Sequence, residues 1–177
     1  GQLTVPGNNL VVDGITLSLA QNHTFNSIHI KNGGVLTTPA ESATYTKGIT
    51  VKAATITVDD GSRIDVTGKG SKPDTASDSY TGGSHGGKGG DYVTYLASAT
   101  YGNYQEPTSF GRGGRPHGGG DHRGGGPTKI EADTLTLNGK ILADGALAPT
   151  GSHSGGAGGS IWLDVGALTS PQGTGEI

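Results

Sequence analysis

Histidines, arginines and an aspartate are concentrated in two glycine-rich runs of this chain. The first run, GGSHGGKGG, spans residues 82–90, and the second, GRGGRPHGGGDHRGGG, spans residues 111–126. In the second run, His117, Asp121 and His122 place two imidazoles and a carboxylate close together in HGGGDH. These ligand types suit zinc and related divalent metals, so the cluster predicts a candidate metal site. The favoured alternative is that the histidines hydrogen-bond carbonyl groups of neighbouring glycine segments, because glycine loops do not by themselves fix ligand geometry.

Carboxylates form two further groups. Asp59, Asp60 and Asp65 lie in VDDGSRID, whereas Asp74 and Asp78 lie in the Ser/Thr-rich stretch DTASD. Such groups could bind Ca²⁺ or take part in polysaccharide cleavage. Asp59 and Asp60 lie in a glycine turn, however, where aspartate is an ordinary turn residue. We therefore expect no enzymatic activity and no resident cofactor, with Ca²⁺ or a histidine-bound divalent metal as the open alternative.

Nucleotides, nucleic acids and membrane insertion are not expected. The glycine runs lack the GxxxxGK[ST] pattern, and their strand-like flanks offer no helix N-terminus to hold a phosphate. The net charge is −3, with 12 basic and 15 acidic residues well mixed, so no basic surface for nucleic acid is indicated. No apolar run approaches the roughly 18 residues that a membrane span needs. Cysteine is absent, which excludes a disulfide framework and thiol ligands.

Aromatic residues gather in the segment between the glycine runs. Five of the six tyrosines lie within residues 67–127. On a polar loop layer, aromatic faces can stack on sugar rings or anchor a protein partner. The alternative is that the rings cover a glycine layer that has no other side chains to bury. The candidate binding residues are Tyr92, Tyr95, Tyr101 and Tyr104.

The rest of the chain predicts an all-β fold. Apolar and polar residues alternate with period two, and helical periodicity is nearly absent. β-branched stretches separated by NG, DG or GG turns predict short strands. These stretches are LTV (3–5), NLVVDGITLSL (9–19), SIHIKNGGVLTT (27–38), GITVKAATITVDDGSRIDVTGKG (48–70), TKIEADTLTLNGKILADGA (128–146) and GSIWLDVGALT (159–169).

Two of these stretches are internal copies of one unit. ATITVDDGSRIDVTGKG aligns with DTLTLNGKILADGA, since each has a strand, a tight glycine turn and a second strand. Strand–turn–strand units that recur without helices between them predict a β-solenoid with parallel stacked coils. The alternative is an antiparallel β-sandwich of about seven or eight strands. In the solenoid, Ile56, Val58, Ile64, Val66, Leu135, Leu137, Ile141 and Ala143 face inward, and Thr55, Thr57, Thr134 and Thr136 face outward.

The glycine-rich segments follow the same point of the repeated unit. Each begins after an I-x-[VA] strand and ends just before the next strand. We therefore expect one domain over residues 1–177, with an ordered layer of glycine-rich loops beside the strands. Its parts are N-terminal strands over 1–47, which could pair with another subunit, a Gly/Tyr/His-rich insertion over 67–127, and a second glycine-rich insertion over 144–159.

The repeated pattern T-[IL]-T-[VL]-x-x-G-x-I-x-[VA]-x-G, together with GGSHGGKGG and GGAGGSIWLDV, carries a resemblance to a known group. It resembles the glycine-rich parallel β-helix regions, of pectin-lyase-like pattern, in large secreted and surface-attached adhesin-like bacterial proteins. The resemblance covers about residues 48–177. It implies a right-handed parallel β-helix in an exported, cell-surface context, and it implies little about activity.

The two ends of such a solenoid expose unpaired backbone groups. No cap is apparent in the sequence, so Leu3 and Val5 at one end and Ile177 at the other are expected to take part in assembly. Head-to-tail strand pairing between copies is a heterologous contact that produces a filament. A chain that has been excised from a longer protein is the alternative. A first residue other than methionine favours secretion with removal of a signal peptide, and Asn22 in the sequon NHT is then a candidate glycosylation site.

Two functions follow as hypotheses. The first is a non-enzymatic extracellular structural protein, the subunit of a surface filament or matrix that self-assembles into fibrils through strand pairing. The second is an adhesin or carbohydrate-binding module of a larger surface protein, with the tyrosine-rich insertion as its binding face. The partners expected are therefore further copies of the chain or glycans.

Overall fold

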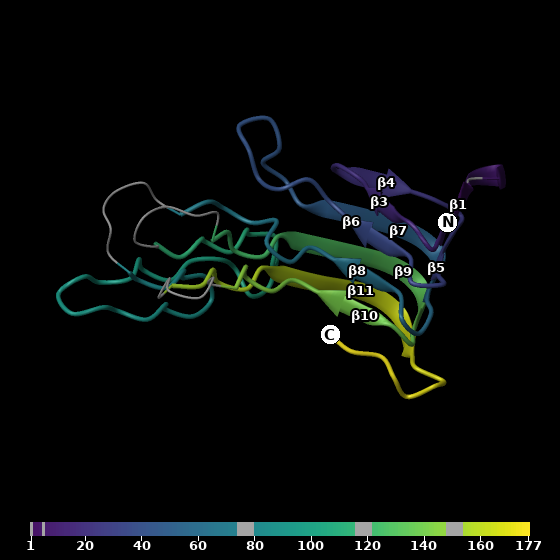
Figure 1. The fold of residues 1–177 in the computed structure, drawn as a ribbon. Coiled ribbons are helices and arrows are strands. Elements are labelled where there is room, and N and C mark those ends of the chain that lie inside the picture. Colours follow the sequence, from purple (N-terminus) through teal and green to yellow (C-terminus); the bar gives the residue numbers. More distant parts are fainter. Residues whose placement is uncertain (1, 5, 74–79, 116–121, 148–153) are drawn as a thin grey trace.

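The computed structural model describes residues 2–4, 6–73, 80–115, 122–147 and 154–177 (Figure 1). His117 and Asp121 of the candidate metal site, Val5 of the candidate assembly end, and Asp74 and Asp78 lie outside the described residues. The described part is all β with parallel sheets, apart from one short 3-10 turn over Pro6–Asn8. None of the described residues forms a helix long and apolar enough to cross a membrane.

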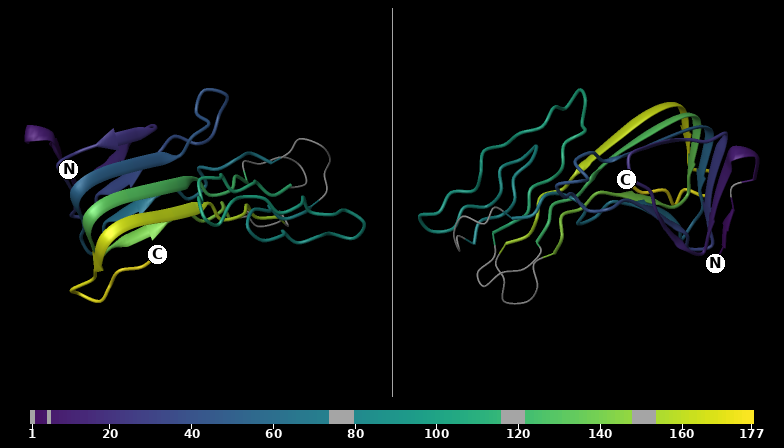
Figure 2. Two further views of the ribbon diagram at one scale, coloured as in Figure 1. Left: turned by 180° about the vertical axis from the view of Figure 1, so that it is seen from behind. Right: turned by 90° about the horizontal axis from the view of Figure 1, so that it is seen from above.

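The chain alternates between two sheets. The strands are β1 (Gln2–Thr4), β2 (Asn9–Asp13), β3 (Thr16–Ser18), β4 (Asn22–Thr24), β5 (Ser27–Lys31), β6 (Val35–Thr37), β7 (Ile49–Val58), β8 (Arg63–Asp65), β9 (Pro127–Leu137), β10 (Lys140–Leu142) and β11 (Ser160–Thr169). The larger sheet has the order β1-β2-β5-β7-β9-β11, with β4 also paired to β7, and the smaller has the order β10-β8-β6-β3. Successive long strands therefore stack on one another, as Figure 2 shows, and each short strand stacks on its own equivalent.

Parallel pairing brings the internal copies into register. In the larger sheet Ile56 pairs with Leu135, and Leu135 in turn pairs with Leu168. In the smaller sheet Ile64 pairs with Ile141. Among the described strands only β1 pairs antiparallel, with β2 of the same chain. This parallel pairing differs from that of the antiparallel sandwich, so that alternative is wrong for this chain.

The core consists of apolar ladders between the two sheets. Seven of the eight residues predicted to face inward are buried, and Ala143 is partly buried against the same cluster. The threonines predicted to face outward are exposed or half-buried. Period-two alternation explains both results, because inward and outward positions alternate along each strand. At the two ends of the stack the ladders are only partly covered, with Ile15, Leu17 and Leu19 at one end and Ile161, Leu163 and Val165 at the other.

The glycine-rich segments run side by side away from the strand ends on one side of the sheets (Figures 1 and 2). We call them the glycine bundle, which comprises the described residues of 66–71, 80–90, 110–115, 122–126, 143–147 and 154–159. They have no strand assignment, yet their backbones are hydrogen-bonded to one another. These hydrogen bonds join the glycine-rich segments to one another beside the strands.

The segment 122–126 lies at the centre of the glycine bundle. Gly70 N–H donates to the Gly124 carbonyl (2.6 Å), and Gly111 N–H donates to the Gly125 carbonyl (2.9 Å). The same segment bonds two further neighbours, since Gly125 N–H donates to Ala157 (2.8 Å) and Ala146 N–H donates to Arg123 (2.8 Å). A strand in a sheet has hydrogen-bonded neighbours on two sides only, whereas this segment has four.

Three consecutive glycines in this segment each face a different neighbour. A Cβ on Gly124 would overlap the backbone of Gly111, and one on Gly125 would overlap the carbonyl of Ala143. A Cβ on Gly126 would lie 2.9 Å from the Cβ of Lys69. A backbone that turns once in three residues presents successive residues to three sides in this way, as extended polyproline II chains do. Glycine is therefore required by close packing on all sides of the central segment.

Replacing Gly125 with alanine is expected to lower the free energy of unfolding by about 1–3 kcal/mol, because the added methyl group would overlap the backbone carbonyl of Ala143. Gly90→Ala is the matched control, since a Cβ at Gly90 meets no atom within 4 Å. Urea unfolding of both variants measures the difference. Equal stability of the two variants would contradict the packing described for the central segment.

Candidate functional site

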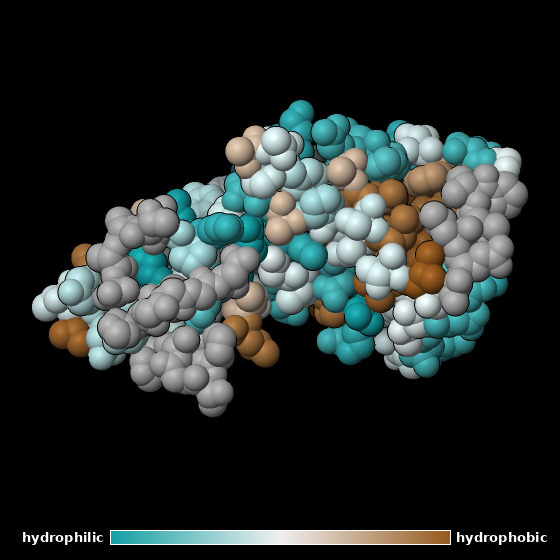
Figure 3. All heavy atoms as spheres, turned by 45° about the horizontal axis from the view of Figure 1, so that its top comes forward, coloured by the Kyte–Doolittle hydropathy of each residue, from teal (hydrophilic) through white to brown (hydrophobic). Residues whose placement is uncertain are grey.

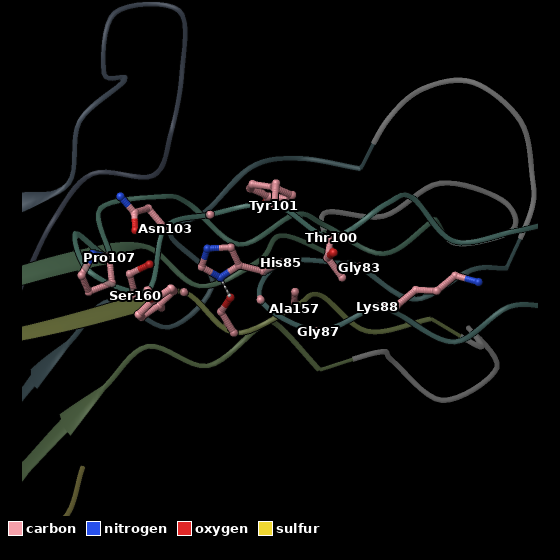
Figure 4. A pocket seen from close by; sticks show the side chains of 15 residues that line it. Gly83, His85, Gly87, Lys88, Thr100, Tyr101, Asn103, Pro107, Ala157 and Ser160 are labelled. Carbon is pink, nitrogen blue, oxygen red and sulfur yellow. Dashed lines mark hydrogen bonds between the residues drawn. The ribbon is translucent and has the colours of Figure 1, made fainter.

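An open pocket of about 760 Å³ lies where the tyrosine-bearing insertion meets residues 157–160 (Figure 4). Six of its 15 lining residues are glycines. The side chains around it are His85, Lys88, Thr100, Tyr101, Asn103, Tyr104, Pro107, Ala157 and Ser160. Two of the four tyrosines predicted to bind, Tyr101 and Tyr104, therefore belong to one concave site.

His85 lies at the middle of the pocket in Figure 4, and its side chain is bonded to a neighbouring segment of the glycine bundle. Its Nδ1 lies 2.9 Å from the Gly158 carbonyl oxygen, and its ring centroid lies 5.1 Å from that of Tyr101. A carbonyl only accepts, so Nδ1 must carry the hydrogen and donate it. In the neutral imidazole Nε2 is then an acceptor, and no described group donates to it.

Tyr101 is a structural support within the pocket wall. Its hydroxyl donates to the Phe110 carbonyl (2.6 Å), and the Arg112 guanidinium carbon lies 5.4 Å from its ring centroid. Burial raises the pKa of Tyr101 above its ordinary value, although the nearby Arg112 acts in the opposite direction. Tyr104, by contrast, is 90% exposed, so its ring is available to a ligand.

Tyr92 and Tyr95 lie in a separate turn of the insertion. Their backbones exchange two hydrogen bonds, with N···O distances of 3.0 and 2.8 Å, and the Tyr92 ring packs 4.8 Å from the ring of Tyr80. Both side chains remain about half exposed, at 42% and 46%. Neither lines the pocket. The structure therefore divides the four predicted tyrosines into two pairs and does not bring them onto one surface.

Asp91 fastens this turn. Its Oδ2 accepts from Lys88 Nζ (2.7 Å), and its Oδ1 accepts from the backbone N–H of Ala97 (2.7 Å). The bond from Lys88, and next the bond from Ala97, lower the pKa of Asp91 below its ordinary value. The carboxylate thus closes the chain over Tyr92–Tyr95 by holding residues on both sides of it.

Of the candidate metal ligands, His122 alone is described. It is buried in the glycine bundle, and its Nδ1 lies 2.6 Å from the Ser154 carbonyl oxygen. Like His85, it bonds a carbonyl of a neighbouring glycine-rich segment, as the alternative interpretation of the histidines expects. Within the described ranges, no group of three or more His, Asp or Glu residues is placed to hold a metal ion.

The other carboxylates singled out in the sequence are engaged in local contacts. Asp59 Oδ2 lies 2.8 Å from His29 Nε2, Asp60 accepts from the N–H of Gly61, and Asp65 pairs with Arg63 at 3.0 Å. These contacts hold turns and strand ends together. They do not bring several acids to one face of the sheet.

Three candidate residues remain: Asn22, Leu3 and Ile177. Asn22 is exposed in β4. Leu3 in β1 pairs with Val12 of its own chain, and Ile177 is 59% exposed. The outer edge of β11 has no partner among the described strands.

His85, Asn103 and Tyr104 line one pocket, and no sequence pattern indicated that they would lie together. These residues are far apart in sequence, and the fold-back of the insertion brings them together. The only available signal was the histidine inside GGSHGGKGG near a tyrosine-rich segment.

Comparisons of the chain with protein-family models, with curated proteins and with solved structures found no match.

Acidification should loosen the Tyr92–Tyr95 turn. The pKa of Asp91 is depressed in the folded protein, so its stabilising contribution is present above the ordinary aspartate pKa of about 3.9 and is lost as the pH falls through the lower, folded-state value. The amide signal of Ala97 in NMR spectra should titrate with a midpoint below about 3.9. In Asp91→Asn this titration should disappear. A midpoint at or above the ordinary value would show that the carboxylate does not hold the turn.

Proposed function

We propose that this chain is a right-handed parallel β-helix module of an extracellular surface protein, with a tyrosine-rich insertion that binds carbohydrate. Alternation of the chain between two stacked parallel sheets supports the β-helix. The register between internal copies supports it further. The resemblance of the glycine-rich repeats to adhesin-like proteins supports the surface location.

One observation carries the binding function: exposed aromatic side chains lie on an insertion whose backbone is hydrogen-bonded within itself and to a neighbouring segment. Tyr92, Tyr95 and Tyr104 are 42%, 46% and 90% exposed, respectively. The bond from Gly83 N–H to the Gly155 carbonyl (3.0 Å) holds the insertion against a neighbouring segment, and the bond from Tyr101 N–H to the His85 carbonyl (2.9 Å) holds two parts of the insertion together. A segment ordered before binding loses less entropy when a ligand arrives, so exposed rings at fixed positions suit recognition.

The proposed function is non-enzymatic. The side chains of Asp59 and Asp65 are engaged by His29 and Arg63, respectively. In the pocket, the Ser160 hydroxyl donates to the Ser109 carbonyl (2.9 Å) and is not bonded to His85. The arrangement is therefore suited to holding a polar ligand and offers no activated serine.

Glycan-array binding tests this function. The wild-type protein should bind at least one class of glycan. Either Tyr104→Ala or the double change Tyr92→Ala with Tyr95→Ala should weaken that binding, according to which of the two groups of exposed rings contacts the glycan. Leu147→Ala is the control, because Leu147 is 92% exposed on the glycine bundle but is not aromatic. Absence of binding to every glycan would overturn the carbohydrate-binding function.

A second candidate function is self-assembly through strand pairing, and the edge strand β11 favours it. This strand of 10 residues has a free outer edge among the described strands. Its core-facing residues Leu163 and Val165 are only half-buried, because no further layer covers them. The opposite end of the stack also has partly covered apolar residues, and Figure 3 shows apolar side chains gathered over the sheets on the face it presents. A further strand layer from another copy would cover both.

Sizing and electron microscopy distinguish this candidate. If β11 mediates assembly, the wild-type protein should form concentration-dependent oligomers or filaments, and Val165→Lys should abolish them by placing a charge on the core-facing side. Asp164→Lys is the matched control, since Asp164 is exposed on the outer side of the same strand. A wild-type protein that stays monomeric at high concentration would rule out assembly through this edge.

A further inference from the structure

We propose that the pocket around His85 binds one ring of a neutral saccharide, with His85 Nε2 accepting a sugar hydroxyl and Tyr104 stacking on the ring. This inference rests on the proposed carbohydrate-binding function and assigns its site. The pocket, and not the Tyr92–Tyr95 turn, is then the point of recognition.

His85 is oriented as a hydrogen-bond acceptor for such a ligand. Its Nδ1–H donates to the Gly158 carbonyl at 2.9 Å, so the lone pair of Nε2 can accept a hydrogen bond from a ligand. Gly102 keeps the approach to this nitrogen open. A Cβ at Gly102 would lie 3.0 Å from Nε2, and the φ of +101° at this residue disfavours any side chain there. A hydroxyl group can therefore donate to Nε2 where a side chain would otherwise block it.

Two neighbouring residues supply the other contacts that a sugar needs. Tyr104 is 90% exposed and lines the pocket, so its ring can pack against the C–H face of a pyranose. Asn103 uses its Oδ1 to accept the N–H of Gln105 (2.9 Å), and its amide NH₂ has no partner among the described residues. An acceptor, a donor and an aromatic face thus lie around one pocket.

The pocket favours a neutral ligand over a charged one. Lys88 is the single charged side chain among the lining residues. Its ammonium group is bonded to Asp91 at 2.7 Å, and Figure 4 shows the side chain extending away from His85. None of the described lining residues carries a carboxylate, so these residues offer no counter-charge to a metal-bridged or cationic ligand. The ligand class that matches is a saccharide without a carboxylate, sulfate or phosphate group.

The test uses the intact chain and defined probes. Neutral oligosaccharides of glucose, galactose, mannose and N-acetylglucosamine are titrated by calorimetry, together with glucuronate- and sialate-containing oligosaccharides. The variants are Tyr104→Ala and His85→Asn. In His85→Asn the amide NH₂ can still donate to Gly158, whereas the Nε2 acceptor is lost. Tyr95→Ala is the matched control, because Tyr95 is exposed but lies outside the pocket.

We expect a neutral oligosaccharide to bind the wild-type protein. Tyr104→Ala should raise the Kd for this oligosaccharide by about three- to tenfold, the range that loss of one aromatic contact gives. His85→Asn should weaken binding similarly, and Tyr95→Ala should leave it unchanged. In the wild type, binding should shift the ¹⁵N signal of His85 Nε2, and this readout does not depend on the variants being folded.

Three other results would overturn the inference. If a glycan binds but Tyr95→Ala weakens it and Tyr104→Ala does not, the carbohydrate-binding function stands and the pocket is not its site. If only the acidic oligosaccharides bind at the pocket, the assignment to a neutral sugar is wrong. If none of the probes binds and none of the glycans on the array binds, the inference and the proposed function both fail.

Discussion

Direct backbone-to-backbone packing in the glycine bundle is the constraint on which the rest of this structure depends. Segments separated widely in sequence approach so closely that a Cβ at Gly83, Gly124 or Gly125 would overlap a neighbour's backbone. At this distance N–H and C=O groups bond one another directly, so backbone groups of the bundle are hydrogen-bonded without a sheet. Only Val66 and Ala143, at the boundary of the described bundle, belong to or pack against the apolar core cluster, and beyond them hydrogen bonding replaces it.

Different interactions hold the sheets and the glycine bundle together. In the sheets, ladders such as Ile56 over Leu135 remove apolar surface from water, and their register fixes where each strand ends. The glycine-rich segments adjoin those strand ends, so stacking of the strands places the segments next to one another. Gly126 N–H, which bonds the Val66 carbonyl at 2.8 Å, connects the two regions at their boundary. The β-sheet stack therefore sets the spacing that the glycine bundle needs.

Sequence patterns predicted the sheets better than the site, for a physical reason. Alternation of side chains reports which face of a strand is buried, and it located the inward ladder from Ile56 to Ile141 correctly. Glycine has no side chain, so its recurrence indicated an ordered layer but not which segment is central. The separation of Tyr92 from Tyr104 depends on how the insertion folds back, and no local periodicity records that. The antiparallel pairing of β1 on its own chain likewise depends on tertiary packing, which a three-residue strand does not specify.

A glycine-built support has a consequence for recognition. Because the central segments have almost no side chains to offer, the chemistry of the pocket comes from few residues, chiefly His85, Asn103 and Tyr104. The backbone bond from Tyr101 N–H to the His85 carbonyl joins the two segments that carry these residues. Changes at such residues can alter the ligand while the support stays intact, as in other scaffolds whose loops carry the binding residues. The same separation explains why Tyr101, which bonds Phe110, belongs to the support although it borders the pocket.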